Sequence, residues 1–259
     1  MKTSKIGTYI NEFCSPYLAE DWDNCGFQIL LGDNDVRKVM VALEITGDVV
    51  EEAVKSDVQM IVTHHPLLFS NVKIINSNDI IGNHIIKLIN NGISVFSCHT
   101  NFDKMEGGNN DYFGKIAGFS DIKKLLNDSS GFCRKGILPS PVTPEELVSH
   151  LAGCLGIDRK HIRIAGDNNK QIKTCAWCTG AGSDFINNAF EEGCDCYITG
   201  DLKYHEVQDA GMLGRCIIDA GHFGTEKIFV PNMAELLCKS IVGKEVQIIQ
   251  SAEDINPFK

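Results

Sequence analysis

The sequence predicts an α/β fold in which helices cover parallel or mixed sheets. Apolar runs rich in valine and isoleucine, such as residues 36–45 and 58–63, alternate with stretches whose apolar residues recur at helical spacing. This alternation of strands and helices is typical of sheets that helices cover. A polar segment at 119–142, with two prolines and a Ser-Ser-Gly run, separates two blocks of this kind. The 259 residues suit one large domain or two small ones.

The first block is predicted to contain three helices and three strands. Residues 3–14 predict a helix because Ile6, Ile10 and Phe13 are spaced along one face, and Pro16 ends it. The remaining elements alternate as strand, helix, strand, helix and strand at residues 36–45, 46–57, 58–63, 78–90 and 93–98.

The second block begins with a strong helix signal. Thr143 is a capping residue, Pro144 occupies the first helical position, Glu146 follows in the same turn, and Gly156 ends the helix. We expect a helix after Ser183 and strands near residues 161–165, 172–178, 195–199 and 215–219. A helical stretch interrupted at Pro231 and a strand in EVQIIQS complete the chain.

The composition predicts a cytoplasmic globular protein. Hydrophobic residues make up 43% and charged residues 22%, which are ordinary values. The N-terminal MKTSKIGTYINEFC lacks the apolar core of a signal peptide, and no apolar run reaches the roughly 18 residues of a membrane span. The eleven cysteines are an odd number, and several lie in apolar runs, which favours reduced, buried thiols. A net charge of −10 argues against binding to long nucleic acids.

The most informative feature is the position of the metal-binding side chains. Four apolar strands each run directly into a cluster of them, in VQMIVT-HHP, GISVFSC-HTNFD, DCYIT-GDLKYHE and RCIID-AGHFGTE. In open α/β sheets, ligands bind in the crevice beyond the carboxyl ends of the strands. We therefore expect the four clusters to gather at one edge of the fold.

Five residues in these clusters are candidate metal ligands. An ordinary strand would point His64 and His65 to opposite faces, but beyond the strand end both can face a crevice and suit two neighbouring ions. A helix would place His222 and Glu226, four residues apart, on one face. Asp103 supplies a hard oxygen ligand. The alternatives are one structural and one exposed histidine, a surface pair, and a turn-forming aspartate.

Together the five side chains would hold two divalent metal ions, which we predict to be Zn, Fe, Mn or Mg. Two ions sharing five protein ligands keep coordination positions open for water, as catalytic sites do. Ions about 3.5–4 Å apart can bind a bridging hydroxide and a substrate oxygen. The ligand count therefore favours a hydrolase over a structural site.

Two further histidines are candidate catalytic residues. His205 in GDLKYHE and His99 in HTNFD are both placed to move protons, and an orienting role stays open for each. His99 is also a candidate ligand, and Asp201, Lys203 and Glu206 are expected to line the same site.

Three other segments contain features of less definite meaning. The segment DWDNCGFQ (21–28) predicts a turn with polar groups, whose function the chemistry alone does not reveal. The glycine-rich CTGAGSDF (178–185) offers backbone N–H groups to a phosphate, although it lacks the full Walker or Rossmann pattern. Cys175 with Cys178, and Cys194 with Cys196, either form a zinc knuckle or are buried thiols, and their place in apolar strands favours thiols.

Six segments, in this order, resemble the GTP cyclohydrolase 1 type 2 family, also known as the Ngg-interacting-factor-three-like family. They are DWDNCGFQ, THHPLLF, HTNFD, CTGAGSDF, TGDLKYHE and DAGHFGTE, and they span residues 21–226. The resemblance implies a dinuclear metal centre with the same five ligands, in which Glu226 bridges the ions. It also implies two interlocked three-layer α/β domains with mixed sheets, a metal site in the crevice between them, and a ring-shaped homohexamer. We expect residues 1–125 and 215–259 to form the first domain and 126–214 the second.

The resemblance further implies GTP cyclohydrolase chemistry on a small-molecule or nucleotide substrate. In that reaction, hydroxide held by the metals attacks C8 of guanine and formate leaves. The residues themselves support metal-dependent hydrolysis in general. Two alternatives stay open: a metal-handling protein or hexameric scaffold without turnover, and a two-metal phosphoesterase.

Overall fold

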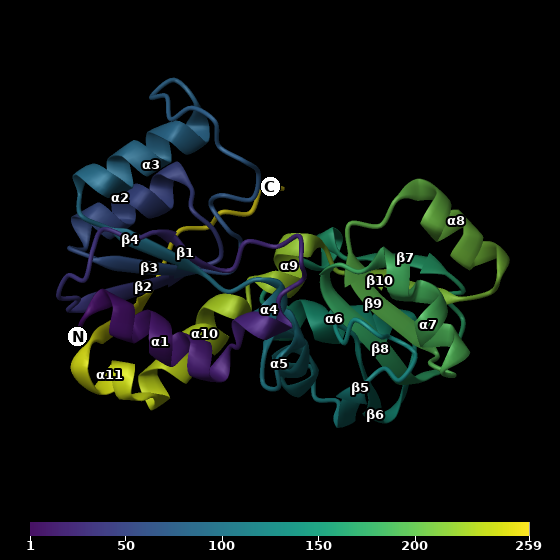
Figure 1. Cartoon of the computed structure of the whole chain (residues 1–259). Helices are drawn as coiled ribbons and strands as arrows, with labels where there is room; N and C mark the ends of the chain where they lie inside the picture. Colours follow the sequence, from purple (N-terminus) through teal and green to yellow (C-terminus); the bar gives the residue numbers. More distant parts are fainter. Residues whose placement is uncertain (259) are drawn as a thin grey trace. The chain divides into compact units, whose positions relative to one another are not determined.

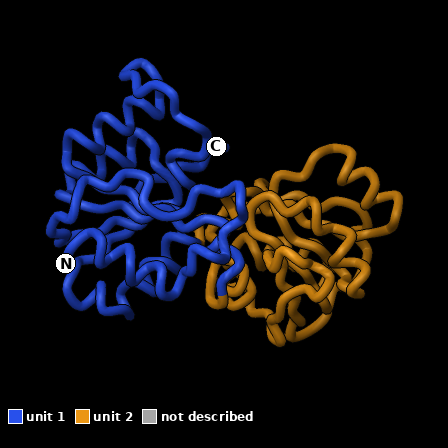
Figure 2. Tube along the Cα trace, viewed as in Figure 1, with its two compact units in different colours: residues 1–105, 229–259 blue, residues 106–228 orange. Residues whose placement is uncertain are grey.

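The computed structural model describes residues 1–258 and divides the chain into two compact α/β units (Figures 1 and 2). Unit 1 comprises Met1–Met105 and the segment from Phe229 onwards, and unit 2 comprises Glu106–Ile228. The chain therefore leaves unit 1, builds the whole of unit 2 and then returns. This confirms the predicted α/β class and the interlocked arrangement.

Unit 1 is built on a mixed five-stranded sheet. Its strands are β1 (Gly26–Ile29), β2 (Lys38–Ala42), β3 (Met60–Thr63), β4 (Ser94–Ser97) and β11 (Gln247–Gln250), in the order β1-β4-β3-β2-β11. All neighbours pair in parallel except β1, which runs antiparallel to β4. Met40, Ile61 and Val95 lie side by side in register in the core. The carboxyl ends of β3 and β4 therefore meet at one edge, where the first two ligand clusters begin.

Helices cover both faces of this sheet (Figure 1). On one face lie α2 (Gly47–Lys55) and α3 (Ile80–Asn90), and on the other α1 (Thr3–Phe13), α10 (Phe229–Lys239) and α11 (Ile241–Glu245). The Thr46 hydroxyl accepts a hydrogen bond from the N–H of Val49 at 3.2 Å and so caps α2. The short elements η1 (Pro16–Leu18) and α4 (Thr100–Lys104) complete the unit.

Unit 2 is built on a mixed six-stranded sheet. Its strands are β5 (Ser120–Lys124), β6 (Arg134–Val142), β7 (Arg163–Gly166), β8 (Ile172–Ala181), β9 (Cys196–Gly200) and β10 (Cys216–Asp219), in the order β5-β6-β8-β9-β10-β7. The central strands β8, β9 and β10 are parallel, and the outer pairs are antiparallel. The last two ligand clusters follow β9 and β10, so they also share one sheet edge.

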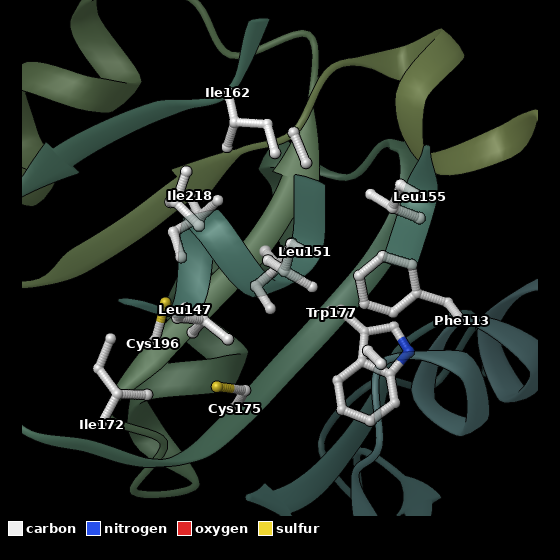
Figure 3. Packing of buried hydrophobic residues seen from close by; sticks show 14 of the residues in the cluster. Phe113, Leu147, Leu151, Leu155, Ile162, Ile172, Cys175, Trp177, Cys196 and Ile218 are labelled. Atoms are coloured by element: carbon white, nitrogen blue, oxygen red, sulfur yellow. The ribbon is translucent and has the colours of Figure 1, made fainter. Parts of the chain in front are cut away.

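Alternation along the strands sorts the core of unit 2 into two faces. Trp177 and Ile218 pack on one face with Leu151 of α6 (Pro144–Leu155) and Phe113 of α5 (Asn109–Ile116) (Figure 3). Tyr197 belongs to the cluster on the opposite face, which also contains residues of α7 (Ile186–Glu191) and α8 (Tyr204–Met212). The remaining short elements are η2 (Arg159–His161), η3 (Ser183–Phe185) and α9 (His222–Glu226).

Helix α6 follows its sequence signals closely. Thr143 and Glu146 form the predicted capping box, with the Thr143 hydroxyl 3.3 Å from the Glu146 N–H and the Glu146 carboxylate 2.8 Å from the Thr143 N–H. Gly156 ends the helix at φ 60°, in the left-handed region that glycine adopts without penalty.

The chain changes units at points that differ from the predicted domain boundaries at 125/126 and 214/215. The changes fall after Met105 and after Ile228. Strand β10 pairs with β7 and β9, and β5 pairs with β6, so both strands belong to the sheet of unit 2. The polar segment 119–142 therefore contains two strands rather than a break. Strand β5 carries no apolar run because four of its five residues are exposed.

Two local predictions need correction. Pro231 does not interrupt a helix but lies in the first turn of α10, where no N–H donor is required. The break falls instead at residues 227–228, between α9 and α10. The predicted turn at 21–28 extends only to Cys25, because Gly26 begins strand β1.

The eleven cysteines are present as thiols, and ten of them are at least partly buried, as the apolar runs predict for several. Cys175, Cys196 and Cys216 lie side by side in register on β8, β9 and β10, inside the core of unit 2. This placement supports buried thiols over a zinc knuckle. Within residues 1–258, no helix is long and apolar enough to cross a bilayer.

Candidate metal centre

The turn after β3 brings two neighbouring imidazoles to the same side of the chain. The N–H groups of His64 and His65 both donate to the Leu43 carbonyl, at 3.0 and 2.9 Å, so the alternation of the strand stops at Thr63. The two ring centroids are consequently only 5.2 Å apart. His64 is fully buried, and its Nδ1 lies 2.8 Å from the Cys98 carbonyl oxygen.

His99, which follows β4, completes a group of three imidazoles in unit 1. The possible ligand atoms of His64, His65 and His99 all lie within 4.8 Å of one another. The Nδ1 atom of His99 is 2.9 Å from Asp23 Oδ1. Asp23 also accepts from the Thr100 N–H at 3.0 Å and from the Thr100 hydroxyl. Burial raises the pKa of Asp23, but the hydrogen bonds from His99 and Thr100 outweigh it and hold that pKa well below its usual range.

Asp103 lies in the same group as these histidines. It is buried in α4, one helical turn after His99, and its Oδ1 lies 3.6 Å from His64 Nε2. A second carboxylate oxygen, Glu44 Oε2, lies 3.6 Å from His65 Nδ1. The structure thus brings His64, His65 and Asp103 together in unit 1, with His99 beside them.

His222 and Glu226 form the corresponding group in unit 2. After β10, Gly221 turns the chain at φ 76°, and α9 begins at His222. His222 Nε2 lies 2.8 Å from Glu226 Oε2, and its Nδ1 lies 2.7 Å from Asp201 Oδ2. Burial lowers the pKa of His222, but Glu226 and then Asp201 raise it further, to about 9. Without a metal, His222 is therefore an imidazolium held between two carboxylates.

Glycines allow the backbone to pass close to this pair. A Cβ atom on Gly180 would lie 2.1 Å from Glu226 Oε1 and 3.5 Å from His222 Nε2. One on Gly200 would lie 2.5 Å from the His222 nitrogen. The Gly180 N–H also donates to Thr225 Oγ1 at 2.9 Å, which fixes the loop against α9. The glycine-rich segment thus supports the carboxylate of Glu226 by close packing.

The same segment does not form the phosphate cradle that the sequence suggests. The Gly180 and Gly182 N–H groups donate to the hydroxyls of Thr225 and Thr199, each at 2.9 Å. These donors are therefore already used inside the protein. The α7 helix that follows has only six residues.

All four histidines share one orientation of the ring nitrogens. Nδ1 is within hydrogen-bond distance of an oxygen in three of them, the Cys98 carbonyl for His64, Asp23 for His99 and Asp201 for His222. In the fourth, His65, Nδ1 faces Glu44 Oε2 at 3.6 Å. An oxygen acceptor at Nδ1 favours the proton on that nitrogen, so that Nε2 of a neutral ring carries the lone pair. Metal-binding histidines in proteins are held in this way by groups behind the ligand. The residues therefore fit a divalent metal.

Sequence reasoning missed the Cys98 carbonyl, which is hydrogen-bonded to His64, and Glu44, which faces His65. Glu44 follows the end of β2, another strand of the parallel set, so its position was the available signal. The backbone carbonyl has no signature in the sequence. His205 is exposed on the first turn of α8, with its ring 5.2 Å from that of Tyr204, and Asp201 of the same motif is the residue that reaches His222. The catalytic role of His205 stays a prediction.

The fold and the site define the class of protein. It is an α/β protein of two interlocked units, with histidine and carboxylate side chains suited to metal binding after the carboxyl ends of its parallel strands. Residues 1–257 match the model of the Duf34/NIF3 (NGG1p interacting factor 3) family. The chain belongs to this family.

Individual relatives agree with this assignment. The chain is 36% identical over 268 residues to a GTP cyclohydrolase 1 type 2 homolog of Clostridium acetobutylicum, covering 100% of this chain and 98% of the relative. Its fold is similar to that of a Bacillus cereus protein related to NIF3, with a TM-score of 0.93, 23% identity, and coverage of 100% of this chain and 99% of that one. It is also similar to reduced HcgD from Methanocaldococcus jannaschii, with a TM-score of 0.82, 27% identity and coverage of 98% of both chains.

Proposed function

We propose that this protein is a hydrolase that depends on two divalent metal ions and acts on GTP or a related nucleotide. The observation that carries the proposal is the shared orientation of four imidazoles, each with an oxygen facing Nδ1, at hydrogen-bond distance in His64, His99 and His222 and at 3.6 Å in His65. Metal-binding histidines in proteins are typically oriented by such an oxygen, which leaves Nε2 to face the metal once the ring is neutral. Imidazole donors combined with carboxylates suit Zn or Fe better than Mg.

We further propose that His64, His65, Asp103, His222 and Glu226 share the two ions, and that Glu226 bridges them. The proposal is supported by the short stretch of chain that links Glu226 to Phe229, a residue packed against His64. The Phe229 ring lies 5.0 Å from the His64 ring and 4.9 Å from the Phe102 ring, all in unit 1. Glu226 precedes Phe229 by three residues, and a trans peptide chain of that length spans at most about 11 Å. Phe102 directly precedes Asp103.

In this proposal the bound ions and the surrounding side chains have different chemical roles. Two bound divalent ions would supply an activated water and polarise a substrate oxygen. Glu44, Asp23 and Asp201 orient their histidines through Nδ1. We propose His99 and His205 as the residues that move protons to and from the substrate. The relatives named GTP cyclohydrolase 1 type 2 homolog motivate the choice of GTP.

The test begins with the metal content of the purified protein and then measures formate release from GTP. Glu226→Gln should lower both the metal content and the rate of formate release. Glu245→Gln is the matched control, because Glu245 is exposed and also ends a five-residue helix, α11. It should leave both quantities unchanged.

Other results would assign the protein elsewhere. Cleavage of a generic phosphodiester with the same sensitivity to Glu226→Gln would favour a phosphoesterase. Tight metal binding without turnover of either substrate would favour metal handling or a scaffold. A protein that retains no divalent ion would contradict the GTP hydrolase, the phosphoesterase and the metal-handling proposals alike.

The family also leads us to propose a homohexamer that works in the cytoplasm. Size-exclusion chromatography with light scattering would test the assembly. A mass close to six times 28.5 kDa is the expected result. A monomer would contradict it.

A further inference from the structure

Two large aromatic side chains lie exposed beside His99. The side chains of Trp22 and Phe69 are each 60% exposed, although apolar rings of this size usually lie inside the protein. Their ring centroids are 6.0 Å apart. Each also lies close to the His99 ring, at 6.2 Å for Trp22 and 6.3 Å for Phe69. The pair therefore borders the candidate metal centre directly.

Hydrogen bonds tie together the two loops that carry these rings. The Asn24 side chain donates to the Leu68 carbonyl at 2.7 Å, and the Leu68 N–H donates to Gln28 Oε1 at 3.1 Å. Gln28 in turn donates to the Asn24 carbonyl at 2.6 Å. Leu68 immediately precedes Phe69, and Asn24 follows Trp22 by two residues. The polar groups of DWDNCGFQ thus hold the exposed rings in a fixed relation to each other.

The relative tilt of the rings suits a flat ligand. The planes of Trp22 and Phe69 meet at 69°, and their angles to the His99 ring are 75° and 83°. A planar ring laid on the face of one aromatic side chain would therefore meet the edge of another. Stacked and edge-to-face contacts are the two favourable arrangements of aromatic rings.

We propose that Trp22 and Phe69 form a platform for the planar heteroaromatic ring of the substrate. Asn24 and Gln28 hold the two loops that carry this platform. The platform would present a nucleobase beside His99 and the metal ligands. This inference assigns the residues that hold the base of the proposed nucleotide substrate and so rests on the proposed function. It also assigns a role to the DWDNCGFQ segment.

Tryptophan fluorescence of the full-length protein gives a direct test by binding alone. The sequence has two tryptophans, and Trp177 is only 1% exposed, so acrylamide quenching reports mainly on Trp22. Guanosine should protect Trp22 from acrylamide, whereas ribose 5-phosphate, which has no aromatic ring, should not. Equal effects of the two compounds, or no effect of either, would overturn the proposal.

Substitutions then show which side chains contribute to guanosine binding. Since stacking of a base on an aromatic side chain contributes appreciably to binding, Trp22→Ala and Phe69→Ala should each weaken guanosine binding by about 5- to 100-fold in calorimetry. Trp22→Phe should restore most of the loss. Asn24→Ala should weaken binding while both rings remain present. Tyr17→Ala removes an aromatic ring that is 96% exposed and should change nothing.

The remaining outcomes separate this proposal from the proposed function. Guanosine binding that depends on Trp22, without formate release from GTP, supports the platform and contradicts GTP hydrolysis. Formate release that Trp22→Ala and Phe69→Ala leave unchanged overturns the platform and leaves the hydrolase proposal intact. If Trp22→Ala changes the assembly size but not guanosine binding, the rings belong to a contact between copies of the chain, and the proposal fails.

Discussion

A single methyl group at Gly180 should weaken the proposed metal binding without removing any proposed ligand. The Cβ atom of Gly180→Ala would lie 2.1 Å from Glu226 Oε1, and real Cβ contacts essentially never fall below 3.0 Å. The gap must therefore widen by at least 0.9 Å, the difference between these distances, and the carboxylate at the end of the flexible Glu226 side chain is the group expected to move. Metal–ligand distances tolerate only about 0.2 Å, so the displaced oxygen no longer fits.

Two separate costs follow from this substitution. Gly180 has φ +72°, and a left-handed conformation costs an L residue about 1–2 kcal/mol. Displacement of Glu226 should lower metal affinity by at least the roughly 10- to 100-fold that loss of a supporting contact costs. The stability loss is common to any glycine in this conformation, whereas the loss of metal affinity is specific to Gly180.

Gly118→Ala provides the matched control. Gly118 has φ +74° but no atom within 4 Å of an added Cβ, so it bears the backbone cost alone. Competition with a chelating dye would measure metal affinity, and thermal unfolding would measure stability. Both variants should be less stable than the parent, but only Gly180→Ala should lose metal. Equal metal affinity in the two variants would refute the role of Glu226 as a ligand.

Three further predictions follow from the burial and charges described above. In the metal-free protein, the imidazolium of His222 stabilises the fold below pH 6.5, and this contribution should disappear as the pH rises through about 9, because its pKa is raised in the folded state. Denaturant unfolding at several pH values would show the free energy of unfolding falling over this range. Glu226→Gln should make that fall smaller. Leu151→Ala should lower the free energy of unfolding by about 2–5 kcal/mol, since Leu151 is fully buried between α6 and the sheet. Iodoacetamide at pH 8 should label the exposed Cys238 and spare Cys25, because burial and then Asp23 raise the pKa of Cys25 to about 12.

Each of these predictions has its own control. Leu126→Ala makes the same chemical change at a side chain that is 86% exposed, and it should alter stability by no more than about 0.5 kcal/mol. A stability slope that persists in Glu226→Gln would contradict the account of His222. Peptide mass spectrometry that finds Cys25 labelled as fast as Cys238 would show that its thiol is not held as described.

The elements that could be predicted from sequence are those whose signals are local. The capping box of α6 and the apolar runs of β2, β3 and β4 each specify their element without help from distant residues. Strand β5 could not be found in this way. Its residues are mostly exposed and charged, and it is a strand because β6 pairs with it at the edge of a sheet. The unit boundaries depend on such pairings, which explains why composition misplaced them.

The candidate site was predictable to the same extent. Side-chain type and position after a strand pointed to His64 and His65, and the structure places their rings together beside Asp103. The residues behind them were less accessible. The Glu44 carboxylate and the Cys98 carbonyl come to lie beside these rings only when the strands are assembled. The Gly180 and Gly182 N–H groups suggested a phosphate cradle because their internal partners, Thr225 and Thr199, are distant in sequence.

Because unit 1 is discontinuous in sequence, its sheet cannot be completed during synthesis until unit 2 has been made. Strand β11 covers one edge of β2, yet it is synthesised after all of unit 2. Until then, β2 exposes unpaired backbone groups that invite pairing with another nascent chain. Unit 2 is continuous in sequence and can fold first. Unit 1, whose first part is synthesised earlier, is completed only afterwards. Truncation before Gln247 should therefore promote aggregation even though every proposed metal ligand is still present.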